Sequence, residues 1–494
     1  MWLQVFQASK EEIGVKMGFF KYDLAFLAIF VIVFLMFVFF RRKNFHREGL
    51  LLLYRTKIGL KFIDYVGKKY TRLLNFLDYI IIFTGYVLMA AIVYLFANMV
   101  YVFVKTPAIA QTIKVPPIMP LIPYLPSLFK IDFLPEFYFT YWIIVLAIIA
   151  IGHEFSHGIF ARHHNVNVKA TGFGFLGPFL AAFVEPDEKQ MAKKGMKPQL
   201  SILSAGSFAN IIMTIIFFII LILFFKLAFI PSGVIFNTYY FSQINVSQIS
   251  SIDGISFSNP SAQEILSQFD NIQENKLEFD NIKLNFTEIK TDKTYLIDTS
   301  SLKKSLEAGN IQLIAFDDFP AIKVGLKGAI SEFNGVKISD SEQLSEELLK
   351  YGPYQNVTLK TISEEKEISY NISLGEKDGK AFLGVAILEY NRGLTGFFYK
   401  IFTFFKDPST YYTAGNFSMF IYNLLWWIVL INLSVGLVNM LPLGIFDGGR
   451  VFYLTILAIT KKEKKARLAL KLVTILLLLL LLVSMVYWWI GINL

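Results

Sequence analysis

The chain has 494 residues, of which 55% are hydrophobic and only 17% are charged. Soluble domains are nearer a quarter charged, so this composition excludes an ordinary soluble protein and indicates a polytopic membrane protein. The absence of cysteine excludes both a disulfide framework and a thiolate metal site. The net charge of +9 does not indicate nucleic-acid binding, because the basic residues cluster beside apolar stretches, where they orient membrane helices.

Six apolar stretches are long enough to cross a hydrocarbon core of about 30 Å. They lie near residues 23–40, 79–104, 137–161, 200–225, 418–440 and 468–489. Lysine and arginine are dense in residues 41–72, which places that segment in the cytoplasm and the N-terminus outside. The basic residues at 189–197 and 461–467 fall on the cytoplasmic side of the same topology. We therefore expect a multi-pass protein of the plasma membrane, embedded in the lipid bilayer.

An acidic segment interrupts this basic membrane part. Residues 231–396 contain 23 acidic and 15 basic side chains, and alternation of the spans places them outside. We expect four parts in chain order. They are a first transmembrane helix with a basic cytoplasmic segment (1–77), a first part of the membrane core (78–230), an extracytoplasmic domain (231–396) and a second part of the membrane core (397–494).

Two of the chain's five histidines stand in the sequence HEFSH, residues 153–157, inside the third apolar stretch. Positions four apart share one face of a helix, so His153 and His157 can bind one metal ion. Glu154 lies beside them, where its carboxylate can take a proton from a water molecule. Ionisable groups in hydrocarbon are costly and are rarely present without a function, although a pair of hydrogen-bonded core histidines is the alternative.

The predicted topology places a carboxylate at the same depth. The third and fifth stretches both run inward, and Asp447 follows the fifth, beyond a helix break at Pro442. Two histidines and one carboxylate leave a fourth tetrahedral position for water, which is the pattern of a catalytic rather than a structural zinc site. A turn residue before two glycines is the alternative for Asp447. His163 and His164 are expected at the membrane interface and not as ligands.

Three motifs together resemble those of the intramembrane site-2 protease family. The first is HEFSH within a span, and the second is NMLPLGIFDGG at residues 439–449, similar to the family's N-x2-P-x4-D-G. The third is GSFAN at residues 206–210, which resembles the family's GPxxN with Ser207 in place of proline. The resemblance covers most of the membrane part. It implies a Zn²⁺ site formed by His153, His157 and Asp447.

The same resemblance suggests further site residues. Glu154 is expected as the general base, and Asn210 as a hydrogen-bond donor to the developing oxyanion, with helix packing among small residues as its alternative. Asn439 is expected either to orient a ligand or to hold the substrate backbone.

Residues 171–185 are apolar but too short to cross a membrane, and their three glycines and one proline disfavour a helix. They resemble the family's re-entrant β-hairpin, which pairs with an extended substrate by edge addition. Gly174, Gly177 and Pro178 are thus expected to bind substrate. A loop lying on the membrane surface is the alternative.

The outer segment resembles a PDZ module over residues 320–338, followed by a predicted helix at 341–350 and strands at 357–362 and 368–372. Residues 249–255 resemble a degenerate second copy. PDZ grooves bind peptides by strand addition, so a peptide ligand is one expectation and a purely structural role is the other.

The expected fold is therefore a polytopic α-helical membrane protein with six transmembrane helices, a re-entrant β-hairpin and an inserted extracytoplasmic α+β, PDZ-like domain. The expected function is a zinc metalloendopeptidase that cleaves transmembrane segments of other membrane proteins. One alternative is a metal-binding membrane receptor or transporter, although transporters usually show repeated halves and scattered polar residues. Another is a membrane-anchored HExxH peptidase that acts on soluble chain ends.

Overall fold

The computed structural model describes residues 19–48, 51–106, 115–129, 131, 134–176, 179–269, 275–279, 282–363, 366–387 and 404–493. The chain divides into two compact units. One comprises Met17–Leu227 together with Asn416–Leu494, and the other is Ala228–Gly415. We call them the helical unit and the inserted unit.

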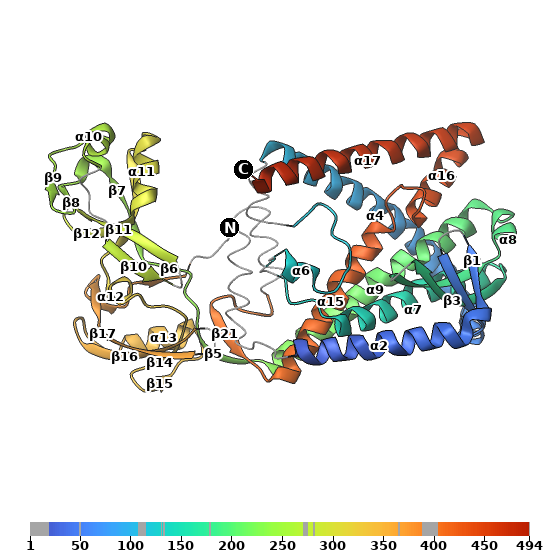
Figure 1. Ribbon diagram of the computed structural model, residues 1–494, viewed down its shortest axis with the longest axis horizontal. Coiled ribbons are helices and arrows are strands. Elements are labelled where there is room, and N and C mark those ends of the chain that lie inside the picture. Colours follow the sequence, from blue (N-terminus) through green and yellow to red (C-terminus); the bar gives the residue numbers. More distant parts are fainter. Residues whose placement is uncertain are drawn as a thin grey trace. The chain divides into compact units, whose positions relative to one another are not determined.

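Six helices of the described chain are long and apolar enough to cross a membrane (Figure 1). They are α2 (Phe20–Arg41), α4 (Thr71–Lys105), α7 (Phe139–His163), α9 (Met196–Ala228), α15 (Asn416–Val438) and α17 (Glu463–Asn493). The six predicted spans are thus confirmed as apolar helices. Shorter helices accompany them: η1 (Arg42–Asn44), α3 (Leu60–Lys69), α6 (Leu125–Leu128), α8 (Glu188–Ala192) and α16 (Asp447–Thr460). Helix α7 packs against α2, α3, α4 and α15, so it lies among other helices of this unit.

An antiparallel sheet completes the helical unit. Its order is β1 (Phe45–Glu48), β2 (Leu51–Thr56), β3 (Val168–Leu176) and β4 (Phe179–Pro186). Strands β3 and β4 form the hairpin expected from the apolar, glycine-rich segment, whereas its re-entrant position in a membrane stays a prediction. The β1–β2 hairpin was not predicted. A side chain at Gly172 would lie 2.2 Å from the carbonyl oxygen of Tyr54, so only glycine lets β2 and β3 pair there.

The N-terminus of α7 is capped by a carboxylate from another helix. Asp23 of α2 is fully buried and accepts hydrogen bonds from the backbone N–H groups of Phe139 and Thr140, each at 2.8 Å. It also accepts from the hydroxyls of Thr140 and Tyr124, both at 2.5 Å. The first N–H groups of a helix have no partner within the helix, and an anion there is favoured by the helix dipole. Asp23 therefore fixes the start of α7.

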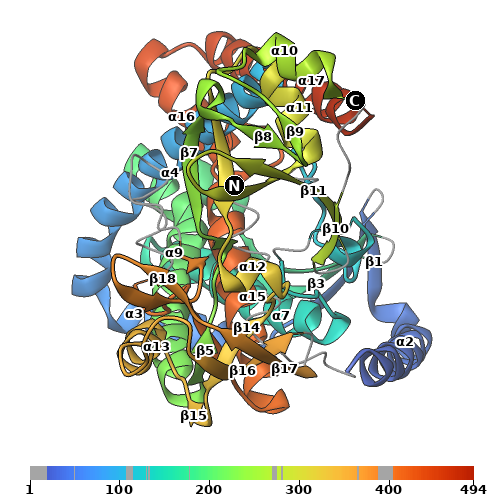
Figure 2. The ribbon, with the colours of Figure 1, turned by 90° about the vertical axis from the view of Figure 1, so that its left-hand side faces the viewer.

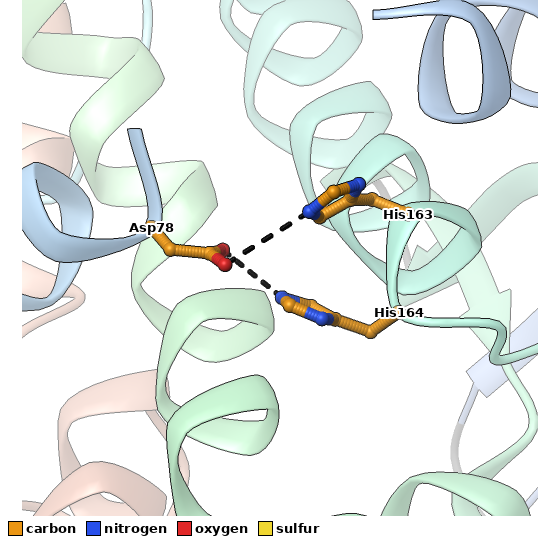
Figure 3. Close-up of side chains that lie close together, drawn as sticks. All are labelled: Asp78, His163 and His164. Atoms are coloured by element: carbon orange, nitrogen blue, oxygen red, sulfur yellow. Dashed lines mark hydrogen bonds and ion pairs between the residues drawn. The ribbon is translucent and has the colours of Figure 1, made fainter. Parts of the chain in front are cut away.

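The C-terminus of α7 is held by a second buried carboxylate, Asp78 of α4 (Figure 3). Oδ1 of Asp78 accepts hydrogen bonds from Ser201 of α9 (2.5 Å) and from Nε2 of His164 (3.0 Å). Oδ2 lies 3.5 Å from the ammonium of Lys197 and 3.9 Å from Nε2 of His163. His164 is the C-cap of α7, so the two neighbouring rings can face the same carboxylate. The network joins α4, α7 and α9.

The inserted unit contains a seven-stranded sheet, a six-stranded sheet and two two-stranded sheets (Figure 2). Its buried apolar side chains form two separate clusters. Its strands are β5 (Ile230–Val234), β6 (Thr238–Tyr239), β7 (Phe241–Asn245), β8 (Ser251–Ile252), β9 (Ile255–Ser256), β10 (Asn275–Phe279), β11 (Ile282–Lys290), β12 (Thr294–Asp298), β13 (Gln312–Asp317), β14 (Ala329–Phe333), β15 (Val336–Lys337), β16 (Asn356–Ser363), β17 (Lys366–Ser373), β18 (Gly375–Lys377), β19 (Lys380–Phe382), β20 (Val385–Ala386) and β21 (Thr410–Thr413). Its helices are η2 (Val246–Gln248), α10 (Ala262–Ser267), α11 (Thr299–Glu307), α12 (Pro320–Lys323) and α13 (Ser341–Leu348).

The predicted helix at 341–350 and the strands at 357–362 and 368–372 are confirmed by α13, β16 and β17. The seven-stranded and six-stranded halves of the inserted unit each contain a similar tight turn. Asp253-Gly254 and Asn334-Gly335 both have positive φ at the two residues, which is the geometry of a tight hairpin turn. The assignment of either half as a PDZ module stays a prediction. The unit reaches beyond the expected insert because β21 pairs with β5.

We expect Asp78→Ala to destabilise the helical unit by about 1–3 kcal/mol, because the buried hydroxyl of Ser201 and the largely buried ring of His164 lose their acceptor. The free energy of unfolding can be measured by denaturant titration in mixed micelles. The matched control is Asp64→Ala, which removes an ion pair to Arg162 from a carboxylate that is 40% exposed. That change should cost about 1 kcal/mol or less. Equal losses in the two variants would contradict the network's role.

Candidate metal centre

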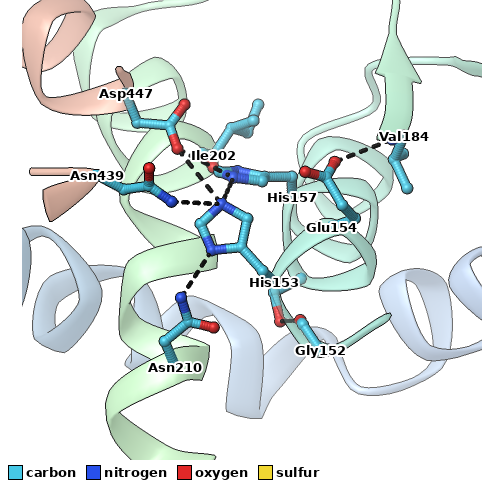
Figure 4. A network of polar contacts seen from close by, with 10 residues as sticks. Gly152, His153, Glu154, His157, Val184, Ile202, Asn210, Asn439 and Asp447 are labelled. Carbon is cyan, nitrogen blue, oxygen red and sulfur yellow. Dashed lines mark hydrogen bonds and ion pairs between the residues drawn. The ribbon is translucent and has the colours of Figure 1, made fainter. Parts of the chain in front are cut away.

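Helix α7 presents two imidazoles on one face. His153 and His157 are one helical turn apart, and their Nε2 atoms lie 3.1 Å from each other (Figure 4). Both side chains are largely buried, with exposed fractions of 9% and 11%. The predicted i, i+4 arrangement is therefore present in the structure.

Asp447 reaches the same point from the start of α16. Helix α15 ends at Val438, and the chain then folds back so that the N–H of Gly448 donates to the carbonyl oxygen of Asn439 at 2.8 Å. A side chain at Gly448 would lie 2.3 Å from the backbone of Met440, and one at Gly449 would lie 2.1 Å from the carbonyl oxygen of Leu443. The two glycines are thus required for the close turn that brings Asp447 to α7.

The three side chains place one donor atom each in a small triangle. Oδ2 of Asp447 lies 3.2 Å from Nε2 of His157 and 3.6 Å from Nε2 of His153. Tetrahedral zinc with bonds of about 2.1 Å separates neighbouring ligand atoms by about 3.4 Å. The donor types and their separations therefore fit a zinc ion with three protein ligands and one open position.

Helix α9 contacts both imidazoles through residues on one of its faces. Nδ1 of His157 donates to the backbone carbonyl of Ile202 at 2.6 Å, which leaves the Nε2 lone pair of the neutral ring for a metal. One turn along, a Cβ at Gly206 would lie 2.4 Å from Nε2 of His157 and 2.5 Å from Cε1 of His153. Another turn along, Nδ2 of the fully buried Asn210 lies 3.1 Å from Nδ1 of His153.

Glu154 faces the sheet instead of the histidines. Its Oε2 accepts a hydrogen bond from the backbone N–H of Val184 in β4 at 2.9 Å. Strand β4 is an edge strand of its sheet, and the N–H of Val184 donates to Glu154, so this N–H lies on the outer edge of β4. The candidate base and the edge of the sheet are thus directly connected.

Of the other predicted site residues, Asn439 joins the cluster, with Nδ2 at 3.4 Å from Nε2 of His153. Gly174 lies in β3, between Leu53 of β2 and Ala181 of β4. Its backbone is flanked by strands on both sides, so the edge nearest to α7 belongs to β4. Gly177 and Pro178 lie outside the described residues.

A second group of possible ligands, Asp78, His163 and His164, also occurs in the described chain. Its geometry is looser, because Nε2 of His163 lies 3.9 Å from Asp78. The ammonium of Lys197, at 3.5 Å, already balances the carboxylate's charge and would repel a cation. The group at His153, His157 and Asp447 is therefore the better candidate metal centre.

Two contacts of this centre were not anticipated from the sequence, those of Ile202 and Val184. Both use backbone atoms, which every residue type carries, so no side-chain pattern marks them. The small-residue cluster around Gly206 was the nearest available signal, because it permits close approach of two helices.

The geometry agrees with the comparison to known families. The model of peptidase family M50 matches residues 141–483, which is more than half of the chain and includes all three candidate ligands. Among curated proteins, none matches the chain significantly. The chain therefore belongs to peptidase family M50, the site-2 protease family of membrane-embedded metalloproteases.

Proposed function

We propose that the protein is a zinc-dependent endopeptidase that hydrolyses peptide bonds within transmembrane segments of other membrane proteins. The observation that carries this proposal is a triangle of donor atoms: the two Nε2 atoms on α7, a helix apolar enough to cross a membrane, and Oδ2 of Asp447 at the start of α16. Because this site lies on an apolar helix, the substrate that would reach it is another apolar transmembrane segment.

His153, His157 and Asp447 would hold the zinc ion. When bound, zinc acts as a Lewis acid and lowers the pKa of a water molecule toward about 7. Glu154 takes a proton from the attacking water on Oε1, while Oε2 stays hydrogen-bonded to the N–H of Val184. The same carboxyl then gives that proton to the nitrogen of the leaving amine.

The substrate would bind as an extended strand along the outer edge of β4, by the edge addition expected from the sequence. Unfolding one stretch of a substrate helix exposes its peptide groups, and a strand edge supplies hydrogen bonds to them. Substrate binding by Gly174, Gly177 and Pro178 stays a prediction, and Asn439 would hold the substrate backbone beside the metal ligands. The oxyanion role of Asn210 remains a prediction. The contact that its side chain makes in the structure is with His153.

The charge pattern supports an orientation with the N-terminus and the inserted unit outside a plasma membrane. The inserted unit has no histidine between residues 231 and 396, so it offers no imidazole to the metal site. We propose that it selects substrates by size. A PDZ-like strand edge that binds a peptide is the second role that we propose for it.

The zinc site can be tested by metal analysis of purified protein. We expect about one zinc per chain, and its loss in His157→Ala and in Asp447→Ala, because two ligands no longer suffice for a tetrahedral site. His164→Ala, at the C-cap of the same helix, is the matched control and should retain zinc, since His164 faces Asp78. Full zinc occupancy in Asp447→Ala would remove Asp447 from the site.

The general base can be tested with Glu154→Gln. We expect cleavage of a transmembrane substrate to fall by about 10²–10⁴-fold or more with zinc retained, because an amide has the shape of the carboxyl but cannot accept the proton. Glu188→Gln, on the exposed helix α8, controls for the chemical change and should cleave like the parent. A Glu154→Gln variant with near-parental activity would show that another group is the base.

The substrate-selection role can be tested by replacing residues 229–414 with a linker, since the inserted unit ends near Gly415. Two substrates with the same transmembrane segment, one with a short and one with a long outer domain, are compared. We expect the parent to cut only the short one and the deletion variant to cut both. If the deletion variant binds zinc but cuts neither, the inserted unit has a role in catalysis or folding and not in selection.

A further inference from the structure

Three successive turns of helix α9 face His153 and His157, and each turn contacts the two rings in a different way. Ile202, Gly206 and Asn210 are spaced four apart, so they lie on one face of the helix. The first offers a carbonyl oxygen to His157, the second leaves room for the rings, and the third sets a buried side-chain amide against His153. Figure 4 shows this amide pointing at the ring from the side away from Asp447.

The chemistry of a ligating imidazole dictates where its proton must be. Nε2 of His153 is the atom that faces Asp447, so its lone pair must be available and the proton must be on Nδ1. An Nδ1–H buried in this environment needs an acceptor, because an unmade hydrogen bond there costs about 1–3 kcal/mol. For His157 that acceptor is the carbonyl of Ile202. For His153 the described group within reach of Nδ1 is Asn210.

Asn210 carries both a donor and an acceptor. Its Nδ2 lies 3.1 Å from Nδ1 of His153, and its Oδ1 is buried with no hydrogen-bond partner among the described residues. The two ends of an amide are nearly the same size, so a half-turn about the Cβ–Cγ bond places Oδ1 where Nδ2 lies, facing Nδ1 of His153, without moving the helix. In the present orientation Oδ1 has no described partner, so the requirement of the metal ligand for an acceptor at Nδ1 favours the turned amide.

We propose that Asn210 is a positioning residue that accepts a hydrogen bond from Nδ1–H of His153 through Oδ1, and so holds this ligand in the tautomer and orientation that bind zinc. The inference rests on the proposed function for the identity of the metal. It assigns Asn210 to the zinc ligand rather than to the oxyanion. Together with Ile202, it makes α9 the element that orients both imidazoles.

Two substitutions separate an acceptor role from a donor role. Asn210→Leu has nearly the shape of the parent and can neither donate nor accept, whereas Asn210→Asp can accept but an ionised carboxylate cannot donate to an oxyanion. The dissociation constant for Zn²⁺ is measured on the full-length protein in detergent by competition with a chelator, without substrate. We expect Asn210→Leu to bind zinc about 10–100-fold more weakly and Asn210→Asp to bind it at least as tightly as the parent.

A matched control addresses packing. Asn432→Leu makes the same change at another fully buried asparagine, whose amide donates to Ile428 of its own helix α15. It should bind zinc like the parent. A second readout is the ¹⁵N spectrum of His153, which should report protonated Nδ1 in the parent and in Asn210→Asp, and a mixture of tautomers in Asn210→Leu. This readout does not depend on cleavage.

Parental zinc affinity in Asn210→Leu would overturn the proposal, and so would an equal loss of affinity in the folded Leu and Asp variants. Parental affinity in both variants with cleavage lost would overturn it in favour of the oxyanion role. A parent protein that binds no zinc at all would refute the proposed function, and that result is distinguishable from the others because it appears before any substitution is made.

Discussion

A charged group that is buried among apolar helices must find partners there, because an unpaired ion in such surroundings costs several kcal/mol. Three carboxylates meet this requirement on the same helix, α7. Asp23 of α2 accepts from the first N–H groups of α7. Asp447 of α16 faces His157 and His153, in the second and third turns from the end of α7, and Asp78 of α4 accepts from His164 at the C-cap. The polar groups that define the site are thereby also the groups that fix α7.

The donor triangle also depends on close approach of the backbone. It forms only because three positions around it lack a side chain. Gly206 leaves space for both rings, and Gly448 and Gly449 let the chain turn back tightly before α16. A methyl group at any of these positions would meet another atom at 2.1–2.4 Å, well inside van der Waals contact. Function here depends on backbone approach as much as on the ligands themselves.

Glu154 connects the metal centre to the sheet. Because its Oε2 accepts from Val184, the orientation of the carboxylate depends on where β4 lies. The position of β4 depends in turn on β3 and β2, and Arg55 of β2 pairs with Glu185 of β4 across the sheet at 2.9 Å. A strand that adds to the outer edge of β4 would therefore lie beside Glu154, the proposed general base. In the proposed function, substrate binding and the placement of the base thus depend on the same strand.

The sequence by itself determined those features that depend on local periodicity and residue type. Apolar runs of sufficient length predicted all six long helices, and the four-residue spacing of His153 and His157 predicted their common face. The span topology and the break at Pro442 predicted that Asp447 reaches the level of the histidines, and Asp447 does lie beside them. These features follow from the helix repeat and from backbone sterics, which neighbouring residues alone decide.

Only the tertiary structure decided the rest. The β1–β2 hairpin was missed because its residues lie in a basic segment, and a short strand is stabilised by the strands it pairs with rather than by its own composition. The sequence marked Asn210 as a site residue but did not identify the group it contacts, since an amide can hydrogen-bond to an oxyanion or to an imidazole equally well. The carbonyl of Ile202 and the N–H of Val184 are present at almost every position of any chain. What selects them is the packing of distant segments, which no local pattern records.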